Sequence, residues 1–464
     1  MAIWSPDLTG KQGSRYLRLV DTLNEDIAAG RLAQGARLPP YRELAYQIGF
    51  SANTVSRAYS EAIRRGLLRG EVGRGTFVRA PDGEIASASP ASLLRHAEGP
   101  IDLSRNLPLP GFAEPYIRDA LSELALETSL NSLLDFQTDR DVSRYTEMGL
   151  RWLDYCGISS SVDRICTTMG AQHGLFCILS ALLSPGDLLL TEALTYESVC
   201  TMAERLGLHL KPVEMDSEGV LPASFEELCR SARPKAFYLT ATLQAPTTVT
   251  LSEVRRLAIA EIAKSHHILL IEDDVFAPLK ADRPAALAEI APEWTIYVTS
   301  LSKAIAPGLR VGFVSAPPSL VQAVHHAINL TVWMTPPITL EVARRLVLSD
   351  TVDLIVRQQR TAAMHRQTLA RDILKNVKLQ SDAVGLHLWI LLPEGRRADE
   401  VRAQCARRGV LVSEGRNFSV EERTAPEALR ICISHEPDEA RLRHALQVVA
   451  SVLREEGKSS GLDI

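Results

Sequence analysis

The sequence predicts an α/β protein in which a small N-terminal domain precedes a much larger body. Between residues 100 and 455, helical periods alternate with short apolar runs, whereas the first 80 residues combine helical periods with a β-ribbon pattern. A chain of 464 residues with 46% hydrophobic residues is long and apolar enough for large cores. At this length we expect about three domains.

In the body, five short apolar runs alternate with helical segments. This alternation predicts a mostly parallel mixed sheet covered by helices on both faces. The runs span residues 187–190, 236–240, 267–271, 295–298 and 311–314. The last part of the chain predicts a smaller α+β unit. We expect it to hold a long helix around 338–376, strands at 384–392 and 429–434, and a closing helix near 437–455.

The first 80 residues carry the pattern of three helices and a β-ribbon. Apolar residues recur at helical spacing over 15–29, a short helix spans 41–48, and Ser51 or Asn53 is placed to cap a third helix. Segments 67–69 and 75–79 then form a two-stranded wing. Two helices joined by a tight turn and followed by a ribbon predict a winged helix-turn-helix. From the pattern alone, a three-helix packing module is the alternative.

The charges are divided unevenly along the chain. Residues 1–80 hold 12 lysines and arginines against 7 acidic residues, and the remainder holds 39 against 49. A basic head on an acidic body indicates that only the head meets a polyanion such as DNA.

The bulk features favour a cytoplasmic protein. No run of 18 apolar residues occurs, and the N-terminus lacks the charged and apolar regions of a signal peptide. The seven cysteines are scattered without a C-x-x-C pair, so we expect free packing thiols and no metal site.

The stretch from Ser300 to Gly312 follows an apolar run and reads S-x-S-K-x-x-x-P-G-x-R-x-G. Its two hydroxyls and its arginine suit a phosphate-bearing aldehyde. Lys303 would form a Schiff base with that aldehyde, and Ser300, Ser302 and Arg310 would hold the phosphate. The spacing resembles the lysine segment of the aspartate-aminotransferase-type pyridoxal-phosphate (PLP) enzymes, which implies that Lys303 is the catalytic lysine.

Further stretches fit this resemblance in the order in which such enzymes present them. Gly170, Ala171 and Gln172 open a helix, whose free N–H groups form a phosphate cradle. Tyr196 resembles the aromatic residue that stacks on the pyridine ring, although by itself it is equally a half-buried core tyrosine.

Carboxylates end a predicted buried strand, where they are costly unless paired. Asp273 resembles the aspartate that pairs with the pyridinium nitrogen, and register makes Asp274 the weaker candidate. Arg430 lies where relatives bind a substrate α-carboxylate, which implies an effector-binding role here.

Three positions depart from the aminotransferase pattern. Ala245 stands where relatives have an asparagine that donates to the phenolic oxygen of the ring, and Phe276 replaces a tyrosine that donates to the same oxygen. Phe136 replaces a partner-chain tyrosine that touches the phosphate. At about 0.5–1.5 kcal/mol per hydrogen bond, we expect as a hypothesis that the combined loss could weaken cofactor binding by one to three orders of magnitude.

The head carries the strings G-x-x-L-P-x-x-R-E-L-A, N-T-V-x-R-A-Y and G-R-G-T-F-V, starting at Gly35, Asn53 and Gly73. These resemble the GntR-type DNA-binding domain. Arg57 can instead pair with Glu61, its i+4 neighbour. Tyr41 and Ala52 replace arginines common in that family, so the operator sequence cannot be transferred. The implied DNA-binding residues are Arg42, Ser51, Asn53, Thr54, Ser56, Arg57 and Arg74.

Together the two resemblances identify the chain as similar to the MocR branch of the GntR transcriptional regulators. We expect a DNA-binding domain over 13–80, a linker over 81–99 and an aminotransferase-like effector and dimerisation domain over 100–455. The last would divide into a large subdomain at about 130–330 and a small one at about 335–455. The resemblance implies PLP, a double-stranded DNA operator, an amino-acid-like or vitamin B6-like effector, and a homodimer that does not bind membranes.

Two alternatives remain for the body. It could be a working aminotransferase with an accessory DNA-binding head. It could also have lost PLP and serve only as a dimerisation scaffold.

Overall fold

The structure is a computed structural model that falls into two compact units, Met1–Leu94 and Arg95–Ile464. Within them it describes residues 4, 6, 15–29, 31–33, 35–64, 67–71, 75–78, 99–127, 130–136, 139–421 and 424–455. The predicted linker lies outside this range, apart from Gly99.

The first unit is the predicted winged helix-turn-helix. Gly49 ends its second helix with a left-handed φ of 68°, and the Ser51 hydroxyl caps the third by accepting the Thr54 N–H at 3.1 Å. Leu44 and Val55 are fully buried between the helices, which fixes their packing. The elements are α1 (Arg15–Ala28), α2 (Tyr41–Ile48), α3 (Ala52–Arg64) and the antiparallel strands β1 (Leu68–Glu71) and β2 (Gly75–Val78).

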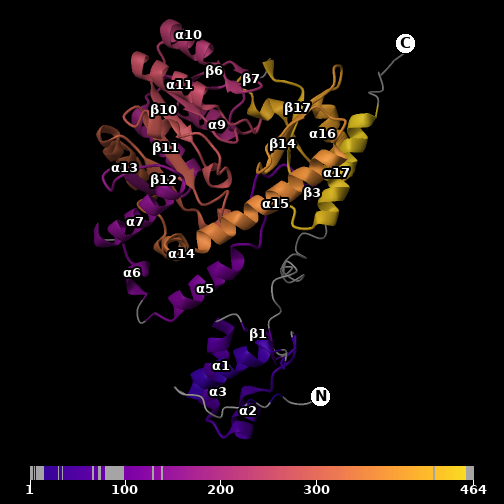
Figure 1. The fold of residues 1–464 in the computed structure, drawn as a ribbon. Helices are drawn as coiled ribbons and strands as arrows, with labels where there is room; N and C mark the ends of the chain where they lie inside the picture. Colours follow the sequence, from indigo (N-terminus) through magenta and orange to yellow (C-terminus); the bar gives the residue numbers. More distant parts are fainter. Residues whose placement is uncertain are drawn as a thin grey trace. The chain divides into compact units, whose positions relative to one another are not determined.

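The second unit contains a seven-stranded sheet in the order β4-β12-β11-β10-β9-β5-β6, with helices packed around it (Figure 1). Strand β12 runs antiparallel to both of its neighbours, whereas the pairs from β11 to β6 are parallel. The mostly parallel sheet predicted from the apolar runs is confirmed. Its strands are β4 (Ile165–Thr168), β5 (Leu188–Glu192), β6 (His209–Val213), β9 (Ala236–Leu239), β10 (Leu269–Asp273), β11 (Thr295–Ser300) and β12 (Gly312–Ser315).

Several helices and a short hairpin accompany this sheet in a large lobe. Helices α8 and α13 contact each other, and α10 lies beside α11. The elements are α5 (Glu114–Ala125), α6 (Asn131–Leu134), α7 (Asp139–Tyr155), α8 (Ala171–Leu182), α9 (Glu197–Arg205), β7 (Met215–Asp216), β8 (Gly219–Val220), α10 (Pro222–Ala232), α11 (Glu253–His266), η2 (Ala277–Leu279), α12 (Leu287–Ile290), η3 (Pro307–Leu309) and α13 (Pro318–Val332).

The small lobe is built on a four-stranded antiparallel sheet in the order β13-β14-β17-β16. Strand β3 (Ile101–Asp102) pairs with β15 in this lobe, although it comes before the large lobe in sequence. The chain of this unit therefore starts in the small lobe and passes to the large one beyond β3. The remaining elements are β13 (Leu379–Gln380), β14 (His387–Leu391), α16 (Ala398–Arg407), β15 (Val410–Leu411), β16 (Ser413–Glu414), η4 (Gly415–Phe418), β17 (Ala428–Cys432) and α17 (Glu439–Arg454).

The prediction of one long helix over 338–376 is wrong, because two helices, α14 (Pro337–Val347) and α15 (Thr351–Ile373), occupy this range. The Ser349 hydroxyl donates to the Leu346 carbonyl and accepts the Thr351 N–H. Such local side-chain bonds compete with the helical ladder, and helical periodicity on both sides conceals the break.

In the described part of the chain, no helix is both long and apolar enough to cross a membrane. All seven cysteines lie in that part and are free thiols.

A buried ion pair holds the carboxyl end of β10 in place. Arg256 on α11 and Glu272 on β10 are both fully buried, with 3.5 Å between Nη1 and Oε1. The Arg256 guanidinium also donates to the Ala241 carbonyl at 2.8 Å, and Glu272 accepts the Leu287 and Ala288 N–H groups. This network fixes the residue before Asp273.

We predict that Arg256→Met lowers the free energy of unfolding by about 3–5 kcal/mol, because it leaves Glu272 buried without its cation. Chemical unfolding of the full chain measures this. Arg118→Met is the control, because it removes only an exposed i,i+4 pair with Glu114 and should cost no more than about 1 kcal/mol. Equal effects of the two substitutions would contradict the prediction.

Candidate cofactor site and DNA-binding surface

Lys303 lies three residues beyond the end of β11, in the loop that leads to η3. Its amine donates to the Asn106 carbonyl at 2.5 Å, so the segment after β3 contributes to its surroundings. Burial lowers the pKa of Lys303 to about 8; the Cys432 thiol and Asp273 carboxyl oppose this shift and the Arg430 charge adds to it. The amine is therefore neutral in an appreciable fraction of molecules at neutral pH, as a nucleophile requires.

The predicted phosphate cradle lies at the N-terminus of α8. Gly170 has a φ of 82°, and a Cβ atom there would lie 2.8 Å from the Arg310 guanidinium. A Cβ on Gly312 would lie 2.8 Å from the Gly170 Cα, so the lysine loop and the helix start approach closely because both positions are glycine. Arg310 donates to the Met169 carbonyl at 2.9 Å. The first N–H groups of α8 and this guanidinium form a suitable site for a phosphate.

The other predicted phosphate and ring contacts surround the cradle. Ala171 begins α8 and is half-buried, while Gln172 is exposed. The hydroxyl of buried Ser300 accepts the Ser302 N–H at 3.4 Å. Burial raises the pKa of Tyr196, which lies close enough to Asp273 and Arg310 for their charges to influence it as well. The structure therefore brings these predicted residues to one end of the sheet.

Asp273 ends β10 with 6% of its surface exposed. Its Oδ2 accepts the Tyr238 hydroxyl at 2.9 Å, and no described residue donates to its Oδ1. Burial raises the pKa of Asp273 to about 6, although the Tyr238 hydrogen bond and the Lys303 charge lower it. A buried carboxylate oxygen without a partner suits a cationic N–H donor from a ligand.

Register distinguishes Asp273 from its neighbour. Asp274 accepts the Tyr297 hydroxyl at 3.1 Å, and its charge interacts with Arg283 and Arg256. Asp274 therefore belongs to the polar network of the core, as the sequence favoured.

Arg430 projects from β17 of the small lobe. Its Nη2 donates to the Ser104 carbonyl at 2.7 Å, and its guanidinium lies 4.5 Å from the centroid of the Phe418 ring. Its Nε is buried and has no hydrogen-bond partner within the described ranges. Arg430 and Lys303 donate to the carbonyls of Ser104 and Asn106, which are two residues apart, so the two side chains lie in one site. A free donor on a stacked guanidinium is suited to a carboxylate.

The three departures occupy different places. Phe276 is buried, and the Lys303 amine lies 5.6 Å from its ring centroid, so this apolar ring adjoins the lysine. Ala245 is also buried. Phe136 is 69% exposed and packs against Trp333 at 5.7 Å between ring centroids. An exposed position suits a residue that would reach a partner chain.

Two residues beside Lys303 were not found from the sequence. The Asn106 carbonyl accepts a hydrogen bond from the Lys303 amine, and the Asn106 side-chain amide lies 3.1 Å from Nδ1 of His387. The two are 281 positions apart in the chain. His387 could have been noticed in the sequence, because it is a polar residue in the otherwise apolar strand β14. Asn106 lies in a loop, where an asparagine is ordinary, and could not have been noticed.

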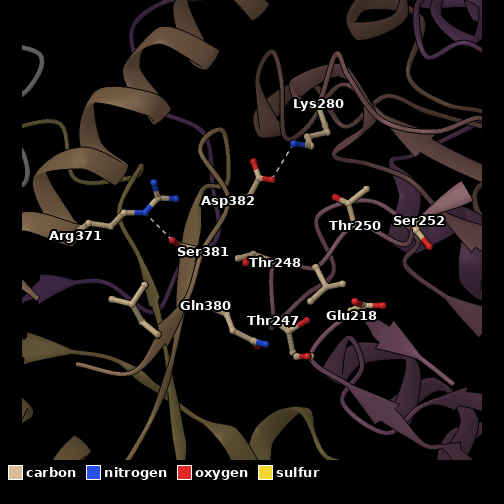
Figure 2. A pocket seen from close by; sticks show the side chains of 13 residues that line it. Glu218, Thr247, Thr248, Thr250, Ser252, Lys280, Arg371, Gln380, Ser381 and Asp382 are labelled. Carbon is tan, nitrogen blue, oxygen red and sulfur yellow. Dashed lines mark hydrogen bonds and ion pairs between the residues drawn. The ribbon is translucent and has the colours of Figure 1, made fainter. Parts of the chain in front are cut away.

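A polar groove of about 780 Å³ lies between the loop at 247–252 and the β13 region of the small lobe (Figure 2). Lys280 and Asp382 form an ion pair across it at 3.0 Å, and Arg371 donates to the Ser381 hydroxyl at 2.9 Å. The Lys280–Asp382 pair therefore links the large lobe to the small one.

The predicted DNA-binding residues of the head gather on α2 and α3. Arg42 is exposed and lies 5.7 Å from the Tyr41 ring centroid. The Ser51 hydroxyl is used as a cap and Ser56 is half-buried, so the two contribute less accessible donors. Arg74 lies outside the described residues.

Arg57 has a neighbour that the sequence did not indicate. Its guanidinium lies 4.1 Å from the Tyr16 ring centroid, because α1 presents that ring to α3. A hollow of about 270 Å³ is lined by Arg15, Tyr16, Asn53, Thr54 and Arg57.

Comparison with known proteins agrees with this geometry. Residues 117–449 match the aminotransferase class I and II family, and residues 15–78 match the gntR family of bacterial regulatory proteins. The chain belongs to the aminotransferase class I and II family and carries an N-terminal GntR-type DNA-binding domain. This combination is that of the MocR regulators, so the predicted family is confirmed.

Relatives with both parts are transcriptional regulators. The chain is 27% identical to the HTH-type transcriptional regulator YdeF of Bacillus subtilis, covering 97% of this chain and 96% of the relative. It is 29% identical to the HTH-type transcriptional regulator TauR of Rhodobacter capsulatus, covering 88% and 90%. The vitamin B6 salvage pathway transcriptional repressor PtsJ of Salmonella typhimurium is 27% identical, with 91% and 95% covered.

Solved structures confirm the fold of the body. Kynurenine aminotransferase from Pyrococcus horikoshii, in complex with PMP, matches with a TM-score of 0.73 at 25% identity, covering 81% of this chain and 96% of that one. The α-aminoadipate aminotransferase LysN of Thermus thermophilus, complexed with N-(5'-phosphopyridoxyl)-L-leucine, matches with a TM-score of 0.70 at 20% identity, covering 80% and 95%.

The cofactor of this fold, pyridoxal 5'-phosphate, fits the residues present. The unpartnered Asp273 oxygen, the glycine cradle and the Lys303 amine offer a partner for the ring nitrogen, the phosphate and the aldehyde respectively. When bound, the cofactor supplies an aldehyde that condenses with an amine and a ring that withdraws electrons.

The lowered pKa of Lys303 predicts how adduct formation depends on pH. The rate at which added pyridoxal phosphate becomes fixed to the protein by borohydride should rise about tenfold per pH unit below pH 8 and level off above it. An unshifted lysine would give a rate that rises steadily towards pH 10. Lys303→Arg is the matched control and should give no fast phase. A rate that rises steadily towards pH 10 in the unmodified protein would contradict the lowered pKa of Lys303.

Proposed function

We propose that the protein is a PLP-dependent transcriptional regulator in which Lys303 holds the cofactor and Arg430 receives the carboxylate of an effector. The observation that carries this proposal is the convergence of Lys303, Asp273 and Arg430 in the body of a chain that begins with a winged helix-turn-helix. The lysine is positioned by the large lobe and the arginine by the small lobe. An effector held by both would therefore favour one arrangement of the lobes.

The residues of the proposed site have separate tasks. Gly170, Ala171, Gln172, Ser300, Ser302 and Arg310 would bind the phosphate; Tyr196 would pack on the ring, and Asp273 would pair with its nitrogen. The effector would be an amino-acid-like or vitamin B6-like compound. The repressor PtsJ, which by its name acts in vitamin B6 salvage, favours the second class.

A homodimer is part of the proposal, with two heads available for two half-sites. It is supported by a set of large apolar side chains that stand exposed on the single chain, since such side chains favour a protein interface. These are Leu126, Leu134, Phe136, Leu330 and Trp333. A regulator acting on DNA would work in the cytoplasm.

Efficient transamination fits the site less well. The proton transfers of that reaction require a lysine amine, which Lys303 supplies. The side chains at Ala245 and Phe276, however, differ from those that donate to the phenolic oxygen in aminotransferases. The relatives that cover most of this chain are named transcriptional regulators, and we therefore assign the body to sensing, with at most residual aminotransferase activity.

We predict that Arg42→Ala weakens binding to the operator by about 1–3 kcal/mol, because an exposed cation on α2 is lost. The visible absorption of the bound cofactor should stay unchanged. Footprinting on the DNA that flanks the protein's own gene measures the affinity. Arg31→Ala removes the same charge from the head but breaks only a pair with Asp26. Equal losses in the two variants would show that net charge, and not position, determines binding.

Lys303→Ala should abolish the visible band of the cofactor adduct yet leave DNA binding measurable. Footprints with and without added pyridoxal phosphate should then coincide for this variant, while they differ for the unmodified protein. A cofactor-dependent footprint that survives Lys303→Ala would contradict the sensing role of this lysine.

A further inference from the structure

His387 stands in β14 directly opposite Cys432 of β17 and is fully buried. Its Nδ1 lies 3.1 Å from the side-chain nitrogen of Asn106, the residue whose carbonyl accepts the Lys303 amine. Its Nε2 is also buried and finds no hydrogen-bond partner in the part of the chain that the structure describes. A histidine that served only packing would have both nitrogens satisfied.

The contact with Asn106 defines the tautomer of His387. The NH₂ group of that amide faces Nδ1 and can only donate, so Nδ1 is the acceptor. The ring proton therefore sits on Nε2. Burial lowers the pKa of His387 to about 3, and the Arg430 charge contributes to the shift. The ring stays neutral, and its Nε2–H group has no acceptor at hydrogen-bond distance among the described residues, although the backbone groups of Gln244 and Pro246 lie near the ring.

His387 lies close to Phe276 and Ala245, the two positions at which donors to the phenolic oxygen are missing. Its ring centroid lies 6.2 Å from that of Phe276, and the Lys303 amine lies 5.6 Å from the same Phe276 ring. The backbone around Ala245 adjoins it as well, because the His387 ring interacts with the backbone groups of Gln244 and Pro246 on either side. His387 thus adjoins Lys303 and both positions at which relatives carry donors to the phenolic oxygen.

We propose that the Nε2–H group of His387 donates to the phenolic oxygen of bound pyridoxal phosphate and takes over the role of the side chains missing at Ala245 and Phe276. This inference depends on the proposed function, since it requires the cofactor to be held at Lys303. His387 is a positioning residue supplied by the small lobe. Because this donor comes from the small lobe, the electron distribution of the cofactor ring would depend on how the small lobe packs against the large one.

A donor to a phenolate stabilises the negative charge and so lowers the pKa of the protonated Lys303–cofactor adduct. The other titratable or charged groups around this pocket are Asp273 on β10, Arg310 in the lysine loop, Arg430 and Cys432 on β17, and Tyr196 before α9. None of them changes in the variants below, so a shift in the adduct pKa reports on position 387.

The test is a pH titration of the visible spectrum of the full-length protein loaded with pyridoxal phosphate. His387→Phe keeps an aromatic ring but removes the donor. It should raise the adduct pKa by about one to two units and weaken cofactor retention in dialysis roughly tenfold or more. His387→Gln offers an amide donor and should stay closer to the unmodified protein. Phe276→Tyr, introduced into His387→Phe, supplies a hydroxyl and should move the adduct pKa back down.

The outcomes are distinguishable. Unchanged adduct pKa values in His387→Phe, or equal shifts in the Phe and Gln variants, would overturn the donor role and leave the proposed function intact. An unmodified protein that takes up no pyridoxal phosphate would overturn both. Thermal unfolding and operator binding of each variant identify a folding defect. If His387→Phe fails to fold, the contrast between His387→Gln and Phe276→Tyr in the unmodified background decides. The inference is supported if the adduct pKa shifts little in His387→Gln. It also requires that Phe276→Tyr lower the adduct pKa only modestly, because His387 already supplies a donor.

Discussion

The cofactor site of the body depends on the buried carboxylate of Asp273, which has one oxygen hydrogen-bonded to Tyr238 and one without a partner among the described residues. A buried charge of this kind costs several kcal/mol unless a cation meets it. The carboxylate is held in this position because the Arg256–Glu272 pair fixes the neighbouring residue of β10. A ring nitrogen that carries a proton would supply the missing partner.

The second constraint is the way in which the chain divides between the lobes. The segment after β3 belongs to the small lobe but reaches the lysine of the large one through Asn106. Arg430 is bonded to the same segment at Ser104. A movement of the small lobe would therefore act on the lysine, the effector arginine and His387 together. Through this coupling, the binding of an effector to the body can be converted into a change in the arrangement of its lobes.

The sequence was sufficient for the features that depend on local spacing. The lysine loop, the glycine at the start of α8 and the carboxyl end of β10 were identified by their order and their place after buried strands. The register that separates Asp273 from Asp274 followed from strand alternation. The winged helix was readable because Gly49 and Ser51 have fixed roles in turns and caps.

Features that depend on distant contacts could not be predicted. Asn106 meets His387 across 281 positions, and no local pattern indicates such a pair. The break between α14 and α15 was hidden because helical periodicity continues on both sides of Ser349. Arg57 lies over Tyr16 because α1 packs beside α3, which its neighbours in sequence could not show.

The most direct test of the central claim is to reduce the protein with borohydride after adding pyridoxal phosphate and to locate the modified lysine by peptide mass mapping. The account predicts one phosphopyridoxyl group, carried by the peptide that contains Lys303. Modification spread over other lysines, or none at all, would contradict it.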